Sequence, residues 1–155
     1  MTGTASETTA PRTPDTSPMP AATAHVLDVT HVDGDAYAVD VRGHQLLVDQ
    51  PEDAGGTDTA PTPTELFAAS LATCIAFYAG RYLKRHGLER AGLRVRAEFA
   101  MATDRPARVA SVRIAISTPP GLSEQRRAAL LAVASHCTVH NTLHHTPTIG
   151  IELEP

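Results

Sequence analysis

The chain has 155 residues, enough for one domain, and 42% of them are hydrophobic, which supplies material for a core. Its formal net charge of −4 argues against a basic nucleic-acid-binding surface, and the lack of any run of about 18 consecutive apolar residues argues against a membrane-spanning helix. Two cysteines are too few for a secreted scaffold stapled by disulfides.

The N-terminal segment, residues 1–22, is dominated by Thr, Pro, Ser and Ala and contains no Leu, Ile, Val or aromatic residue. Such a segment cannot bury enough apolar surface to offset its ordering entropy, so we expect a disordered tail followed by a single domain over 23–155. The tail also lacks the apolar stretch of a secretory signal, which favours a cytoplasmic protein with reduced thiols.

Three short segments rich in β-branched residues come next. Residues 24–32 and 36–42 flank the turn sequence Asp33-Gly34-Asp35, which predicts a hairpin, and a third strand is expected over 45–48. Residues 51–61 are rich in Gly, Thr and Asp and are expected to form a loop.

A long helix is predicted over residues 62–86. Thr62 is a favourable N-cap, Pro63 occupies the first helical position, and Glu65 completes a capping box. The middle of this segment is apolar on every face, which predicts a helix that is buried on all sides.

Shorter elements complete the chain. Apolar and polar residues alternate over 93–99 and 111–116, which predicts two strands; an amphipathic helix is expected over 123–135, a helical turn over 137–143, and a last strand over 149–153. The resulting order, β-β-β-α-β-β-α-β, predicts an α+β fold with a mainly antiparallel sheet.

The two cysteines are the candidate reactive groups. Cys74 lies in the middle of the long helix, where a free cysteine is often only a small hydrophobic residue of a core. Cys137 lies among polar residues, and a nearby imidazolium would favour its thiolate. Cys137, His140 and His144 are also spaced to share one helix face, so a zinc site is an alternative, although no carboxylate ligand is near in sequence.

Two motifs resemble a known family. Gly-Gly-Thr-Asp at 55–58 with Pro-Thr-Pro-Thr-Glu-Leu-Phe-Ala-Ala-Ser-Leu-Ala-Thr-Cys at 61–74, and Cys-Thr-Val-His-Asn-Thr-Leu at 137–143, resemble the OsmC/Ohr family of peroxide-handling proteins. The resemblance extends from about residue 24 to the end and includes both cysteines. It implies an OsmC-like fold and an intertwined homodimer in which two central helices pack together.

The resemblance also implies a chemistry. Cys74 would attack an organic hydroperoxide and become a sulfenic acid, which would condense with Cys137 to give a disulfide. A dithiol reductant, dihydrolipoamide in the Ohr branch, would restore both thiols, and neither a metal nor an organic cofactor would be needed.

The chain departs from the best-characterised branch at three positions. In that branch a hairpin arginine pairs with the attacking cysteine and a glutamate holds the arginine; here the hairpin tip has none, and Arg42 is the nearest substitute. The glutamate position is occupied by Thr64, with Glu65 next to it, and Thr138 replaces the family's usual proline.

Two functions remain in competition. The missing hairpin arginine favours a non-catalytic dimeric protein that binds a small apolar ligand in its interface cavity. The presence of both cysteines in separate elements favours a cysteine-based hydroperoxide reductase with Cys74, Cys137, Glu65 and Arg42 as site residues, and this is the function we predict.

Overall fold

The structure is a computed structural model that describes residues 25–154, so the expected tail over 1–22 lies outside the described residues. One compact unit spans Val26–His145, and residues 146–154 belong to a separate part of the chain. Within the compact unit, two small antiparallel sheets and three α-helices form an α+β fold, as predicted.

The first sheet contains the three predicted strands. β1 (Asp28–Asp33), β2 (Ala36–Val41) and β3 (His44–Val48) pair antiparallel in that order. The turn between β2 and β3 is made by Arg42 and Gly43, both with positive φ (52° and 80°), a combination typical of a tight hairpin turn. A short 3₁₀ turn, η1 (Glu52–Ala54), lies in the loop that follows.

The long helix α1 (Pro63–Arg85) begins as predicted. Thr62 is its N-cap, and its hydroxyl accepts the backbone N–H of Glu65 at 3.2 Å while the Glu65 carboxylate accepts the backbone N–H of Thr62 at 2.7 Å. The capping box is therefore complete. The helix ends one residue before His86, and Gly87 then adopts a positive φ of 65° that favours glycine.

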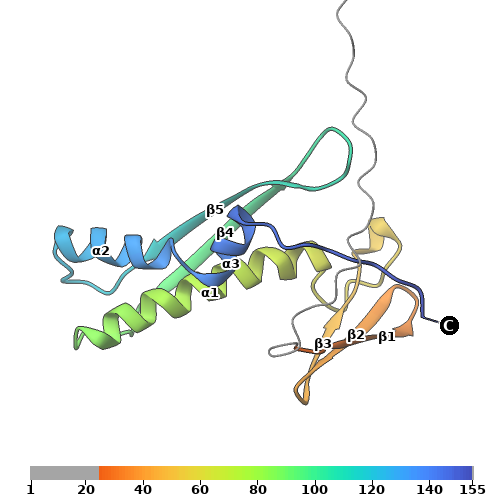
Figure 1. The fold of residues 1–155 in the computed structure, drawn as a ribbon, viewed down its shortest axis with the longest axis horizontal. Coiled ribbons are helices and arrows are strands. Elements are labelled where there is room, and N and C mark those ends of the chain that lie inside the picture. The colour runs from red at the N-terminus through yellow and green to blue at the C-terminus, as the bar shows by residue number, and fades with distance from the viewer. Residues whose placement is uncertain (1–24, 155) are drawn as a thin grey trace, which may run out of the picture. The chain divides into compact units, whose positions relative to one another are not determined.

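The core of the compact unit forms on one side of α1. The helix contacts β4 (Arg94–Met101) and β5 (Val109–Ser117), which pair antiparallel, together with α2 (Glu124–Ala134) and α3 (Thr138–His144). Figure 1 shows α1 running alongside α2 and the β4–β5 ribbon. The buried cluster of α1, α2 and the start of α3 consists of Leu71, Ile75, Ala79, Tyr82, Leu83, Leu130, Ala134 and Cys137.

The prediction that α1 is buried on all sides is wrong for the single chain. Phe67 is 36% exposed and Phe77 is 58% exposed, because the elements that contact α1 cover only the stripe that carries Leu71, Ile75 and Leu83. By length and composition alone α1 is long and apolar enough to cross a membrane, and 39% of its most apolar 18-residue stretch is buried. Its packing against two strands and two helices is that of a core helix.

The strand predicted over 149–153 is absent from the described residues. Ile149, Ile151 and Leu153 alternate as in a strand, but all three are exposed and no backbone ladder pairs them. An alternating pattern needs a neighbouring strand to complete its hydrogen bonds, and the described part of the chain supplies none for this segment.

Candidate functional site

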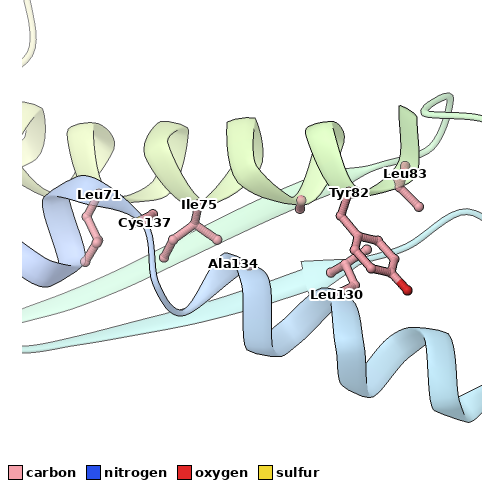
Figure 2. Close-up of a cluster of buried hydrophobic side chains, with 8 residues drawn as sticks. Leu71, Ile75, Tyr82, Leu83, Leu130, Ala134 and Cys137 are labelled. Atoms are coloured by element: carbon pink, nitrogen blue, oxygen red, sulfur yellow. The ribbon is translucent and has the colours of Figure 1, made fainter. Parts of the chain in front are cut away.

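The fold brings the two cysteines together. Cys74 lies in the middle of α1 and is partly exposed, whereas Cys137 is the N-cap of α3 and is fully buried. Figure 2 shows Cys137 beside Leu71 and Ile75, which lie one turn apart on α1. Both thiols are free, and Cys74 packs against the core cluster that contains Cys137, close enough to raise the pKa of the Cys137 thiol.

The surroundings of Cys137 keep its thiol protonated. Burial raises the pKa of Cys137, and the hydrogen bond and negative charge of Cys74 raise it further. The backbone N–H of His140 donates to the Cys137 sulfur at 3.4 Å and opposes this rise, as does the N–H of Val139, but the pKa stays above its usual range. Cys137 therefore remains a neutral thiol near neutral pH.

This arrangement gives the two thiols different chemical access. An oxidant arriving from solvent meets the partly exposed sulfur of Cys74 before the buried sulfur of Cys137. A thiol that is buried, protonated and already in contact with its neighbour is placed to react only after that neighbour has been oxidised. The geometry fits an attacking cysteine at position 74 and a resolving cysteine at position 137.

The short helix α3 is held next to α1 by a second polar contact. The Tyr78 hydroxyl, one turn after Cys74, lies 3.1 Å from the Thr138 hydroxyl, next to Cys137. Further along α3, the Nδ1–H of His140 donates to the Ser135 carbonyl, and the Nε2 atoms of His140 and His144 are 2.9 Å apart. These contacts fix the segment that carries Cys137.

An apolar hollow of about 250 Å³ lies on the buried side of α1. It is bounded at one end by Ser135 and His140, and its other lining residues come from α1, β5 and α2: Leu71, Ile75, Val112, Ile114, Ile116, Leu131 and Ala134. One of its lining residues, His140, also donates its N–H to the Cys137 sulfur, which places the hollow near Cys137.

Glu65 and Arg42 are not brought to the cysteines. Glu65 is exposed and its carboxylate is engaged in the capping box, nine residues and about 13 Å of helix rise before Cys74. Arg42 is exposed at the β2–β3 turn and forms no ion pair or hydrogen bond among the described residues. Within one chain, neither side chain can act on Cys74 directly.

The zinc alternative receives no support from side-chain grouping. Over residues 25–154, no three His, Cys, Asp or Glu side chains cluster in a way that would hold a metal ion. His140 and His144 do face each other, but the Cys137 sulfur is directed toward Cys74 and the N–H of His140.

Sequence reasoning missed a buried carboxylate, Asp49, that organises the loop before α1. Asp49 is 1% exposed and accepts hydrogen bonds from the backbone N–H groups of Gln50, Thr57 and Thr59 at 2.7, 3.2 and 3.0 Å. The hydroxyls of Thr57 and Thr59 donate as well, each at 2.8 Å. The Thr59 and Gln50 N–H groups are the main causes of a pKa far below the usual range of a carboxyl.

The same loop explains the Gly-Gly pair of the first motif. A Cβ atom at Gly56 would lie 2.0 Å from the Gln50 carbonyl oxygen and 2.7 Å from a carboxylate oxygen of Asp49, so only glycine fits. The Asp49 N–H also donates to the Pro61 carbonyl at 3.3 Å, which joins the two ends of the loop just before the N-cap. In the sequence, Asp49 is followed by Thr57 and Thr59 within a loop, and this pattern does not indicate that the carboxylate is buried.

Sequence comparison identifies the family. The family model described as OsmC-like protein matches residues 56–152, which include α1, both cysteines and every later element. The chain therefore belongs to the OsmC-like family. No curated protein sequence matches it.

Solved structures share the fold. A Psychrobacter arcticus protein named for osmotic stress induction and a detoxification response is 27% identical, with a TM-score of 0.70 over 75% of this chain and 85% of that one. An organic hydroperoxide resistance protein OsmC from Legionella pneumophila is 18% identical, with a TM-score of 0.56 over 86% and 96% of the two chains. An organic hydroperoxide resistance protein from Elizabethkingia anophelis is 20% identical, with a TM-score of 0.57 over 81% and 92%.

Proposed function

We propose that this protein reduces organic hydroperoxides with Cys74 and Cys137, as a homodimer in the cytoplasm. The observation that carries the proposal is that a partly exposed cysteine packs against the core cluster that holds a buried, protonated one. Membership of the OsmC-like family and the hydroperoxide resistance proteins among its structural neighbours support the same chemistry.

The first step consumes the hydroperoxide. The Cys74 thiolate attacks the distal oxygen, so that an S–O bond forms and the O–O bond breaks. Cys74 becomes a sulfenic acid, and the alkoxide that leaves takes a proton from solvent to become the alcohol. The Cys137 thiol, held neutral by burial, takes no part in this step.

The second step forms the disulfide. The Cys137 sulfur displaces the hydroxyl group of the Cys74 sulfenic acid as water, so that one S–S bond forms and one S–O bond breaks. A dithiol then reduces the Cys74–Cys137 disulfide by exchange and is itself oxidised to a disulfide. We infer a lipoyl-type dithiol as the reductant from the family resemblance.

We propose that the cation which favours the Cys74 thiolate is supplied by a second chain. Arg42 makes no described contact with Cys74, so we propose that the Arg42 turn of a second copy reaches the Cys74 of the first across the dimer. Glu65 would form an ion pair with such an arginine at the N-terminus of α1, where its carboxylate also completes the capping box.

A second candidate function rests on the apolar hollow. Its volume of about 250 Å³ and its hydrocarbon lining suit a small apolar ligand, which a dimeric binding protein would hold without turnover. In a reductase the same hollow would hold the organic group of the hydroperoxide. The two functions differ in whether a bound hydroperoxide oxidises the thiols.

Single-turnover kinetics separate these functions. Reduced protein should consume one equivalent of tert-butyl hydroperoxide, Cys137→Ser should also consume the first equivalent, and Cys74→Ser should consume none. Arg42→Ala should slow this step while leaving the melting temperature unchanged. Equal consumption by the reduced protein and by Cys74→Ser would overturn the role of Cys74, and no consumption by the reduced protein would favour ligand binding instead.

A further inference from the structure

The contact between Tyr78 and Thr138 has a specific place in the fold. It is the one side-chain hydrogen bond that joins α1 to α3 in the described part of the chain. Tyr78 follows Cys74 by one helical turn, and Thr138 follows Cys137 directly. The hydrogen bond therefore joins the two elements close in sequence to both cysteines.

The helix α3 has few other anchors. It is seven residues long and none of its own residues is buried, so its attachment to α1 depends on its N-cap Cys137, on the partly buried Val139 and on the Tyr78 contact. Segments with so few buried contacts open readily. Loss of one anchor should change how often Cys137 stays against Cys74.

The Tyr78 ring is itself held in place. It packs partly against the core cluster and stands edge-to-face with Phe77, with ring centroids 5.8 Å apart. The hydroxyl is thus presented to Thr138 by a side chain with little freedom, which lowers the entropic cost of the hydrogen bond.

We propose that the Tyr78–Thr138 hydrogen bond positions Cys137 for the resolving step, which makes these two residues positioning residues of the proposed peroxidase cycle. The inference rests on the proposed function. The attack of Cys137 on the oxidised sulfur of Cys74 requires the two sulfurs to approach about 2 Å, and the hydrogen bond holds the first turn of α3 where this approach needs little movement. The first attack on hydroperoxide involves Cys74 alone and does not use the contact.

The test measures how the Cys74 sulfenic acid partitions between two fates. It is either resolved to the disulfide or over-oxidised to a sulfinic acid by excess hydroperoxide, and peptide mass analysis gives the ratio. Tyr78→Phe and Thr138→Val each remove one hydroxyl and keep the shape of the side chain. Each should raise the sulfinic-to-disulfide ratio about three- to tenfold, the range expected for one hydrogen bond, with the rate of the first attack unchanged.

Three further variants make the result specific. Thr138→Ser should restore the wild-type ratio, and the double variant should behave like either single variant because both lose the same bond. Thr73→Val is the matched control, since the Thr73 hydroxyl is next to Cys74 in sequence but binds only carbonyls of its own helix, and its ratio should equal that of the wild type.

The outcomes are distinguishable. A wild-type ratio in both Tyr78→Phe and Thr138→Val, or an equal rise in Thr73→Val, would overturn the positioning role while the proposed function stands. A wild-type protein that forms no disulfide at all would overturn the proposed function and this inference together.

Discussion

The two cysteines show how residue environment divides one chemistry into two roles. Cys74 is partly exposed, whereas the Cys137 sulfur is buried and has a pKa raised by burial and by Cys74. The thiolate is the reactive form of a cysteine, so the buried Cys137 sulfur, with its raised pKa, should be a slow nucleophile.

Alkylation of the native, reduced protein should therefore label Cys74 first. Iodoacetamide at about pH 8, slightly below the pKa of an ordinary thiol, should modify Cys74 several times faster than Cys137, as read by mass analysis of the peptides. In denaturant the two rates should become similar, which serves as the control. Faster labelling of Cys137 in the native protein would contradict the assigned roles.

The buried carboxylate of Asp49 gives a second residue-scale prediction. Its pKa lies far below normal, so its contribution to stability is present above the unfolded pKa of about 4 and is lost as the pH falls toward the folded pKa. Asp49→Asn should lower the melting temperature near neutral pH, because the Asn NH₂ would face donors from Thr57 and Thr59. The difference from wild type should narrow as the pH falls below about 4.

Asp40→Asn provides the matched control. Asp40 is an exposed carboxylate on β2 with one 3.3 Å hydrogen bond from Gln45, so its replacement should change the melting temperature little at any pH. If Asp49→Asn lowers the melting temperature by the same amount at acidic and at neutral pH, the role of the Asp49 charge is contradicted.

The start of α1 is the clearest case at the scale of the element. Thr62→Ala and Glu65→Ala should each reduce the free energy of unfolding by about 1 kcal/mol, because each removes one half of the capping box. Urea titration measures this loss. If Glu65 acts only through the cap, Glu65→Ala should consume hydroperoxide at the wild-type rate under conditions in which it is fully folded. A large fall in that rate with little loss of stability would instead support a role of Glu65 in the site.

Local signals explain which elements were predictable. The cap at Thr62, the Gly-containing hairpin turn and the alternation in β4 and β5 depend on residues close in sequence, and the structure contains each of these elements near its expected position. The α+β class follows from their order.

Contacts between distant residues explain what could not be predicted. The Tyr78 hydroxyl meets Thr138 across 60 positions, and no local pattern indicates this pair. The burial of Asp49 depends on a loop that closes over it, and strand formation at 149–153 depends on a neighbouring strand. Both cysteines were found through motifs, but their direct contact is a product of the packing of α1 against α3.

At the scale of the whole molecule, the uncovered face of α1 predicts a dimer. Phe77 is 58% exposed, and the Arg81 guanidinium lies 5.5 Å from the centre of its ring. Both residues line a groove along the C-terminal half of α1, whose walls also include Lys84, Arg85 and Arg90. An apolar helix face of this kind marks an interaction surface. The family resemblance makes a second copy of the chain the expected partner.

Light scattering tests the dimer directly. At micromolar concentration the protein should have the mass of two chains, with an interface above the roughly 2,000 Å² typical of permanent complexes. Phe77→Glu should shift it toward the monomer by placing a charge in that interface, whereas Phe99→Glu on β4, at a residue that is 36% exposed, should not. A monomeric wild-type protein would contradict the dimer and, with it, the supply of Arg42 from a second copy.

The most direct test of the central claim is peptide mapping after a single oxidation. Reduced protein is treated with one equivalent of tert-butyl hydroperoxide and digested without reductant. The wild-type protein should yield one intrachain cross-linked peptide that joins Cys74 to Cys137. Cys137→Ser should instead carry a sulfenic or sulfinic acid at Cys74. Hydroperoxide loss with Cys74 still reduced, or no change at either thiol, would contradict the account.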